Sequence, residues 1–211
     1  MMQIAIVLFE RFTALDAVGP YQVLSLLPEA ETAIVAERAG PVRDDRGSLA
    51  MVAAAALTDV PAPDIVVVPG GPGAREQLSD GPLPEWLRAA DATSTWTTSV
   101  CTGSLILAAA GLLAGRRATT HWSATDRLAE LGAEPVGERV VFDGKYVTAA
   151  GVSAGIDMGL TLAGTIAGDR VAQAIQLAIE YDPQPPYHAG SPTTAPAEVT
   201  AGLLRILSDA R

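Results

Sequence analysis

The chain has 211 residues, of which 49% are hydrophobic and 18% charged, and its formal net charge is −10. This composition is typical of a globular protein with a sizeable buried core, and it argues against long disordered segments. An acidic surface repels phosphate backbones and anionic lipids, so we expect neither nucleic acid nor a membrane as a partner.

The cysteine and histidine content narrows the chemistry further. The single cysteine, Cys101, excludes an intrachain disulfide and any multi-cysteine metal site. His121 and His188 are far apart in the sequence and the carboxylates are scattered, so we expect no metal site. The first residues lack the basic region of a signal peptide, and the most apolar run, 105–113, is shorter than the about 20 residues that span a bilayer. We therefore expect a cytoplasmic protein.

The N-terminal part predicts two strands, a helix and a hairpin. Residues 4–9 form a continuous apolar run, which is typical of a strand buried on both faces of a parallel sheet. Residues 17–27 have helical apolar spacing, and Asp16 stands where an N-cap or first-turn acid is common. Residues 32–37 predict a second strand. Residues 42–56 alternate loosely, as in a small hairpin or an extended excursion.

The middle of the chain continues the alternation of strands and helices. Residues 64–68 predict another fully buried strand, which runs into a glycine-rich turn at 70–73. Glycines there permit a positive φ and a close approach of the backbone. The pattern then predicts a helix at 82–90, a strand at 95–100 and a helix at 102–113.

The C-terminal part contains shorter elements. They are expected in this order: a strand at 118–120, a helix ending at 131, a hairpin of 140–142 and 146–148, helices at 153–167 and 170–180, a proline-rich arm at 181–192 and a last helix at 197–207. Strands that alternate with helices imply a parallel sheet covered on both faces. We therefore expect one α/β domain over residues 1–211, which ends in the arm and the last helix.

Three of the predicted strands are followed by residues suited to catalysis. In open parallel α/β sheets, ligands bind at the carboxyl ends of the strands. The first strand is followed by Asp16, another by Gly70 and Gly71, and another by Cys101. Because parallel strands share one carboxyl edge, we expect these residues to meet. Asp16 would then serve a site, the alternative being that it only caps its helix.

The segment VCTGS around Cys101 has the pattern of a nucleophile elbow. In such an elbow, the nucleophile occupies a strained strand-to-helix turn, and a small residue two places on lets the helix pack. The partial positive charge of a helix N-terminus favours a thiolate, so we expect the pKa of Cys101 to lie below its ordinary value of about 8.5. The alternative is a buried cysteine that acts as a small hydrophobic side chain.

Four other residues are candidates for supporting roles. Gly70 and Gly71 can offer backbone N–H groups to a developing negative charge, or they form only a tight turn. Thr102 follows the cysteine, and we expect its N–H and its hydroxyl to lie beside the sulfur. His121 is a candidate accessory base for the thiol; the alternative is a structural histidine near a subunit contact.

At these residues the sequence resembles the ThiJ/PfpI superfamily. The resemblance extends over nearly the whole chain, and its motifs are LDAVGPY (15–21), PGG (69–71), TSVCTGS (98–104) and GRRATTHW (115–122). It implies a flavodoxin-like three-layer α/β/α sandwich with a mostly parallel sheet, an elbow cysteine and a homodimer.

One branch of that superfamily, the isonitrile hydratases, fits best. It shares an aspartate at the position of Asp16, a threonine at the position of Thr102 and an arm like residues 180–192. The resemblance implies that a small organic isonitrile is hydrated to an N-substituted formamide through a covalent thioimidate on Cys101, without a cofactor. Asp16 would act as the acid and then the base, and the N–H groups of Gly71 and Thr102 would stabilise charge at the reacting centre.

Other members of the superfamily supply the alternatives. A glyoxalase-type carbonyl lyase would use the same cysteine and acid, and a non-catalytic oxidative stress sensor would oxidise Cys101 to the sulfinate. PfpI-type peptidases carry a histidine directly after the cysteine, where this chain has Thr102, so peptidase activity is disfavoured. Related transcription regulators carry DNA-binding helices, and we expect none here because a single helix is predicted after the arm.

Overall fold

A computed structural model describes residues 1–209 of the chain, with side chains up to residue 207. The chain divides into two compact units, of which the first is Met1–Ile179 and the second begins at Glu180. The first unit contains the central sheet and every site residue predicted from the sequence. The second unit contains the proline-rich arm and helix α7 (Ala197–Asp209).

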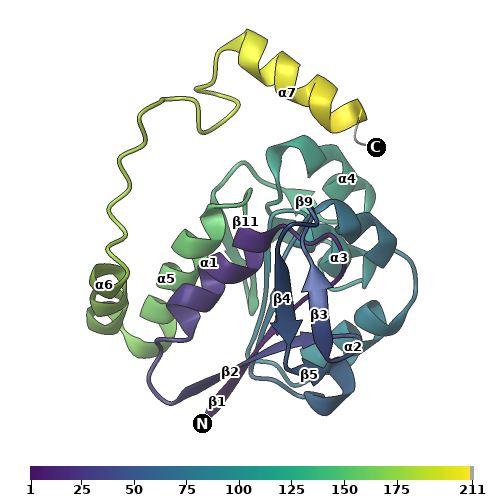
Figure 1. Ribbon diagram of the computed structural model, residues 1–211, viewed down its shortest axis with the longest axis vertical. Coiled ribbons are helices and arrows are strands. Elements are labelled where there is room, and N and C mark those ends of the chain that lie inside the picture. The colour runs from purple at the N-terminus through teal and green to yellow at the C-terminus, as the bar shows by residue number, and fades with distance from the viewer. Residues whose placement is uncertain (210–211) are drawn as a thin grey trace. The chain divides into compact units, whose positions relative to one another are not determined.

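The first unit is built on a seven-stranded sheet in the order β10-β11-β7-β6-β1-β2-β5 (Figure 1). Its strands are β1 (Met2–Val7), β2 (Ala30–Ala36), β5 (Ala55–Ala56), β6 (Ile65–Val68), β7 (Trp96–Val100), β10 (Val140–Asp143) and β11 (Tyr146–Ala149). Neighbouring strands are parallel except for the β10–β11 hairpin at one edge. The structure thus confirms the predicted mostly parallel sheet.

Helices cover both faces of this sheet. They are α1 (Ala14–Leu24), α2 (Pro82–Asp91), α3 (Gly103–Ala109), α4 (Thr125–Glu130), α5 (Ala154–Ala167) and α6 (Asp169–Ala178). Figure 1 shows α1 and α5 on one side of the sheet and α2, α3 and α4 on the other. The result is the three-layer α/β/α sandwich that the resemblance implies.

Two predicted elements differ from the structure. Helix α3 ends at Ala109, before the predicted end at 113, and the following turns contain Gly111 and Gly115 with φ of 84° and 66°, values that interrupt a right-handed helix. The strand predicted at 118–120 is only β8 (Arg117–Ala118). It pairs with β9 (Glu134–Pro135) in a separate two-stranded sheet and does not join the central one.

Other short elements complete the first unit. The hairpin predicted within 42–56 is present as β3 (Gly40–Arg43) and β4 (Ala50–Ala53), which pair antiparallel. Three short 3-10 turns follow later in the chain: η1 (Leu57–Asp59), η2 (Pro72–Gln77) and η3 (Trp122–Ala124). Among the residues described, no helix is both long enough and apolar enough to cross a membrane.

The core lies where the sheet meets its helices. All four residues of β6 are at most 1% exposed, and burial of each such valine or isoleucine stabilises the fold by roughly 1.5–3 kcal/mol. Helix α5 approaches α1 closely because it carries glycines at the contact. A Cβ on Gly155 would lie 3.0 Å from Cδ of Pro20, and one on Gly159 would lie 2.9 Å from Cβ of Val23. This contact holds the start of α5 next to the helix that carries Asp16.

Candidate active site around Cys101

The carboxyl ends of three neighbouring strands form the site. Strands β7, β6 and β1 lie side by side and run parallel, so the loops that follow them open on the same edge of the sheet. Strand β7 leads to Cys101, β6 leads to Gly70 and Gly71, and β1 leads into the loop before Asp16. The convergence predicted from the sequence is therefore present.

Cys101 occupies a strained elbow between β7 and α3. Its φ of 57° lies in the left-handed region, which costs a non-glycine residue about 1–3 kcal/mol and persists only where the surroundings hold the residue there. Hydrogen bonds on both sides do so. Its N–H donates to the carbonyls of Ala149 (3.0 Å) and Ala150 (3.1 Å), and its carbonyl accepts from Ser104 Oγ (3.1 Å) and Thr120 Oγ1 (3.0 Å).

Gly103 explains why the residue two places after the cysteine is small. A Cβ at this position would lie 2.2 Å from the carbonyl oxygen of Val68 and 2.7 Å from that of Pro69. Any side chain would therefore push α3 away from the end of β6. The glycine allows the helix to begin directly behind Cys101, as the elbow pattern predicts.

Asp16 is completely buried and lies in the first turn of α1. It does not cap the helix, because the N-cap position is Thr13 and the carboxyl of Asp16 is bonded elsewhere. Its Oδ2 accepts a 3.0 Å hydrogen bond from the N–H of Gly70, and its carboxyl interacts with the Cys101 thiol. Oδ1 is buried without a hydrogen-bond partner among the described N–H and O–H groups. The acid and the thiol therefore form a pair.

Gly70 and Gly71 lie at the site, but in a different role from the one expected. The N–H of Gly70 is used by Asp16, and the N–H of Gly71 donates to Thr102 Oγ1 at 2.9 Å. Neither group is available to an oxyanion unless one of these bonds breaks. The expectation that they are oxyanion donors is therefore not met, because the carboxyl of Asp16 and the hydroxyl of Thr102 take both N–H groups.

Thr102 has one of the two expected contacts with the sulfur. Its backbone N–H bonds the Cys101 sulfur, as predicted. Its hydroxyl accepts from the Gly71 N–H and donates to the Gly71 carbonyl at 3.3 Å, so it holds the glycine turn. A Cβ on Gly70 would lie 2.5 Å from the Thr102 nitrogen and 3.0 Å from Asp16 Oδ2, which explains why the turn needs glycine there.

The environment of Asp16 raises its pKa to about 7. The largest cause is burial, which removes water from the carboxylate, and the negative charge of Asp45 adds to it. The Gly70 N–H and the Cys101 thiol act in the opposite direction, because both stabilise the charged carboxylate. Asp16 can therefore both give and take a proton near neutral pH.

The pKa of Cys101 is raised well above its ordinary value, so the expected lowering is wrong. Burial is the largest cause, since only 6% of the residue is exposed, and the charge of Asp16 adds to it. The N–H groups of Thr102 and Val152 favour the thiolate but do not outweigh these effects. A helix N-terminus stabilises a negative charge by up to about 2 kcal/mol, whereas full burial disfavours the charged form by up to about 4–7 kcal/mol. At neutral pH, Cys101 therefore keeps its proton.

His121 lies at the N-cap of η3, directly after Thr120, whose hydroxyl donates to the Cys101 carbonyl. Its Nδ1 is 2.8 Å from Ser123 Oγ and accepts from the Ser123 N–H at 3.3 Å, and its ring lies 5.4 Å from that of Trp122. Burial lowers its pKa, so the ring is neutral near pH 7. The hydrogen bonds recorded for this ring go to Ser123, which favours the structural alternative over an accessory base for the thiol.

Two residues at the site were missed in the sequence analysis. Val152 offers its N–H to the sulfur from the loop between β11 and α5, and Asp45, at the β3–β4 turn, raises the pKa of Asp16. No local pattern marks either residue, because each acts through its position in the fold. Within residues 1–207, no three His, Cys, Asp or Glu side chains gather in a way that could hold a metal ion.

Known proteins resemble this chain over most of its length. A model of the DJ-1/PfpI family matches residues 2–165. Isonitrile hydratase of Pseudomonas putida is 45% identical over 198 residues, which cover 94% of this chain and 86% of that protein. The crystal structure of a ThiJ/PfpI family protein from Pseudomonas syringae has a TM-score of 0.95 and 40% identity, and the match covers 99% of this chain and 86% of that one. Drosophila melanogaster DJ-1beta shares the fold, with a TM-score of 0.78 at 20% identity over 85% of this chain and 97% of its own.

Proposed function

This chain belongs to the DJ-1/PfpI family, and from this premise we propose that it is an isonitrile hydratase, which converts an organic isonitrile and water into an N-substituted formamide. The identity of 45% with the Pseudomonas putida enzyme supports this activity. The observation that carries the proposal is the pairing of a buried thiol with an acid whose pKa is about 7.

Isonitrile chemistry suits this pair better than carbonyl chemistry does. When a thiol adds to a carbonyl, negative charge develops on oxygen and needs N–H donors. Here the N–H groups of Gly70 and Gly71 are already bonded to Asp16 and Thr102. When a thiol adds to an isonitrile, the terminal carbon accepts both the sulfur and a proton, so the essential partner is an acid. These bonds favour the hydratase over a glyoxalase-type lyase.

The same environment disfavours an oxidative sensor. Oxidation to the sulfinate begins from the thiolate, and sensor cysteines are therefore exposed and have a low pKa. Cys101 is 6% exposed and its pKa is raised. A thiol that keeps its proton is suited to a reaction in which its sulfur and its proton both bond to the same carbon atom.

In the first proposed step, the sulfur of Cys101 attacks the terminal carbon of the isonitrile. The thiol proton passes to the Asp16 carboxylate and from there to that carbon. The S–H bond breaks, S–C and C–H bonds form, and the product is the neutral thioimidate Cys–S–CH=N–R. The N–H groups of Thr102 and Val152 stabilise charge on the sulfur while it attacks.

In the second proposed step, water adds across the C=N bond. The Asp16 carboxylate accepts a proton from the water as the oxygen bonds to carbon, and then passes this proton to the nitrogen, which returns Asp16 to its carboxylate form. The adduct Cys–S–CH(OH)–NH–R then collapses: the C–S bond breaks, the C=O bond forms and the hydroxyl proton returns to the sulfur. The formamide leaves with the thiol regenerated, so the cycle consumes only the isonitrile and water and needs no cofactor.

The test is a pair of assays on the purified protein and its Cys101→Ala variant. We expect the wild-type protein to form the formamide from a simple alkyl isonitrile and to leave methylglyoxal unconsumed. The variant is expected to form no formamide while its circular dichroism spectrum is unchanged. Consumption of methylglyoxal without formamide formation would replace the hydratase with a carbonyl lyase.

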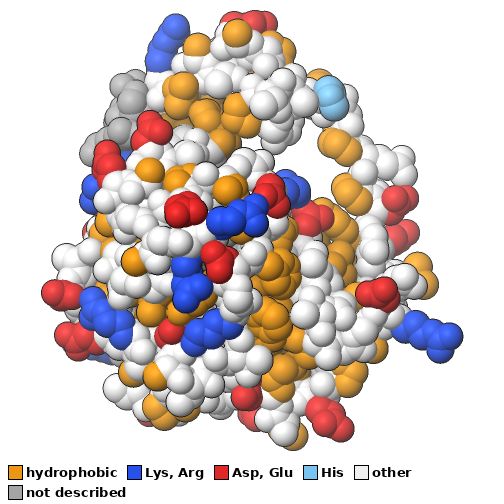
Figure 2. All heavy atoms as spheres, turned by 180° about the vertical axis from the view of Figure 1, so that it is seen from behind, with side chains coloured by type: hydrophobic (Ala, Val, Ile, Leu, Met, Phe, Trp, Pro, Cys, Tyr) orange, Lys and Arg blue, Asp and Glu red, His pale blue; other side chains and the backbone are white. Residues whose placement is uncertain are grey.

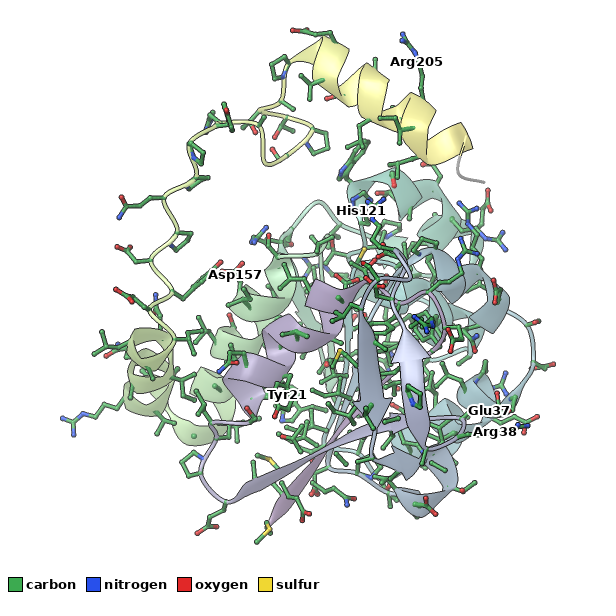
Figure 3. All side chains as sticks on the ribbon, viewed as in Figure 1. Tyr21, Glu37, Arg38, His121, Asp157 and Arg205 are labelled. Carbon is green, nitrogen blue, oxygen red and sulfur yellow. The ribbon has the colours of Figure 1, made fainter. Side chains whose placement is uncertain are left out.

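We propose further that the enzyme is a cytoplasmic homodimer acting on a small molecule. Support for the dimer comes from α1, where Leu15, Val18 and Tyr21 are spaced by three and remain 36–41% exposed. Figure 3 shows Tyr21 on this helix. A second copy would cover such an apolar surface. Light scattering coupled to size-exclusion chromatography tests the dimer, and a monomeric mass at micromolar concentration would exclude it.

The surface charge supports a small-molecule partner. On the face seen in Figure 2, basic and acidic side chains are interspersed and do not form a basic patch. Together with the net charge of −10, this arrangement disfavours nucleic acid as a partner.

A further inference from the structure

Gly151 and His121 are in close contact beside the active site. Gly151 lies in the loop between β11 and α5, directly before Val152. A Cβ on Gly151 would lie 2.5 Å from Cδ2 of His121 and 3.4 Å from its Nε2, so the edge of the ring fills the place of a side chain. The φ of Gly151 lies outside the left-handed region, so the ring, and not backbone strain, is what excludes alanine there.

The His121 ring is held in one orientation. Nδ1 accepts from the Ser123 N–H and lies 2.8 Å from the Ser123 hydroxyl, and Trp122 packs against the ring. The preceding residue, Thr120, donates its hydroxyl to the Cys101 carbonyl at 3.0 Å. The segment that carries His121 is thus tied to the elbow on one side and contacts the Gly151 loop on the other. Figure 3 shows His121 at this end of the sheet.

The loop beside the His121 ring is strained. Val152 has a φ of 33°, which is unfavourable for a β-branched residue and persists only where the surroundings impose it. In this conformation its N–H bonds the Cys101 sulfur. If the loop relaxed towards an ordinary backbone conformation, this N–H would turn away from the sulfur.

We propose that His121 is a positioning residue, whose ring edge presses on Gly151 and thereby holds the Val152 N–H on the Cys101 sulfur. The expected effect of this role on turnover rests on the proposed hydratase function, whereas its effect on the Cys101 sulfur does not. His121 does not exchange protons with the substrate. It acts through the loop, by keeping one of the two N–H donors that stabilise charge on the sulfur when it attacks and when it leaves.

The test removes side-chain volume at His121 and adds it at Gly151, first separately and then together. His121→Asn retains an N-cap acceptor for the Ser123 N–H but removes the ring edge. Gly151→Ala adds a methyl group that collides with the ring. In the double variant, the methyl group occupies the space that the ring has vacated. We therefore expect both single variants to displace the loop and the double variant to restore it.

The first readout is the rate of Cys101 alkylation by iodoacetamide as a function of pH, which does not depend on the hydratase reaction. Loss of a hydrogen bond to a charged group favours the neutral thiol. Each single variant is expected to react about tenfold more slowly between pH 7 and 9, with its profile moved to higher pH. The double variant is expected to lie within about twofold of wild type.

The second readout is steady-state kinetics on an alkyl isonitrile. Because the displaced N–H acts on the sulfur and not on substrate binding, kcat should fall about tenfold in each single variant while KM changes little, and kcat should recover in the double variant. The matched control is Gly164→Ala in helix α5, where a Cβ would meet its neighbours at an ordinary 3.6 Å. This variant should leave both readouts unchanged.

Additive losses in the double variant, or a wild-type alkylation profile in His121→Asn, would overturn the proposal. If His121→Asn does not fold, His121→Ser provides a second variant with an N-cap side chain and no ring. The wild-type protein could show no isonitrile turnover while the double variant still recovers the wild-type alkylation rate. This outcome would exclude the hydratase function and support the positioning role of His121.

Discussion

The N–H of Gly70 and the Oδ2 atom of Asp16 are joined by a 3.0 Å hydrogen bond that crosses from the end of β6 to the first turn of α1. This bond fixes the carboxyl beside the Cys101 thiol while its other oxygen stays without a hydrogen bond from the described N–H and O–H groups. It offsets only part of the cost of burying a charged carboxylate, and the pKa of Asp16 is therefore about 7. The contacts that fix the position of the Asp16 carboxyl thus also set its pKa.

The first prediction concerns the pH dependence of turnover. Below pH 7, Asp16 and Cys101 both carry a proton, and the acid cannot accept the thiol proton that the first step must move. Above pH 7, the carboxylate is free while the thiol keeps its proton, because the pKa of Cys101 is raised. We therefore expect kcat/KM to increase about tenfold per pH unit below an inflection near 7 and then to reach a plateau. A kcat/KM that declines above pH 7 would assign the active form to the doubly protonated pair.

The second prediction concerns Gly70. A methyl group at this position would lie 2.5 Å from the Thr102 nitrogen and 3.0 Å from Asp16 Oδ2, so Gly70→Ala must displace the acid, the elbow or both. We expect kcat to fall by at least about a hundredfold and the free energy of unfolding to fall by about 1–3 kcal/mol. Steady-state kinetics and urea denaturation measure the two effects.

Gly137→Ala is the matched control for Gly70→Ala. Gly137 is exposed, its φ is outside the left-handed region, and a Cβ there would meet no atom within 4 Å. Its kinetics and stability should equal those of wild type. Equal kcat values in the two variants would show that the Asp16–Gly70 contact is unimportant for turnover.

The third prediction concerns stability. The pKa of Asp16 rises from 3.8 to about 7 on folding, so the folded state binds its proton more tightly than the unfolded state does. The resulting stabilisation is complete below pH 3.8 and is lost as the pH rises through about 7. Asp16→Asn has no such proton, so its stability relative to wild type should increase by up to about 4 kcal/mol between pH 4 and pH 8. Urea denaturation across this range measures the difference, and a constant difference would mean that Asp16 is charged throughout.

Much of the site could be predicted because it follows from strand direction. Three parallel strands bring their carboxyl ends together whatever the details of packing, so Asp16, Gly70 and Cys101 meet as expected. The elbow was also predictable, because a cysteine with a glycine two places on marks the turn from β7 to α3.

The electrostatics could not be predicted, because they depend on burial. The sequence places Cys101 before a helix. It does not reveal that the residue is buried, with only 6% exposed, or that a carboxyl lies beside it. The role expected of Gly70 and Gly71 failed for a related reason. Their N–H groups look available until Asp16 and Thr102 are seen to use them.

The last prediction uses Asp16→Asn again, to distinguish the role of Asp16 from that of Cys101. Asp16→Asn keeps the size of the side chain, and its carbonyl oxygen can still accept the Gly70 N–H. It removes the negative charge that raises the pKa of Cys101, and it can place an N–H₂ group beside the sulfur. The thiol of the variant should therefore ionise at lower pH than in wild type, and its alkylation by iodoacetamide should be faster at pH 7 to 8.

Hydration should change in the opposite direction. An amide cannot pass a proton to the isonitrile carbon or take one from water, and general acid–base catalysis contributes about 10²–10⁴-fold. We therefore expect kcat of Asp16→Asn to fall by at least about a hundredfold although its nucleophile is more reactive. The measurement pairs an alkylation rate with formamide production on the same protein sample. If Asp16 served only to activate or orient the thiol, the two rates would change together; faster alkylation with slower hydration identifies it as the group that carries the proton.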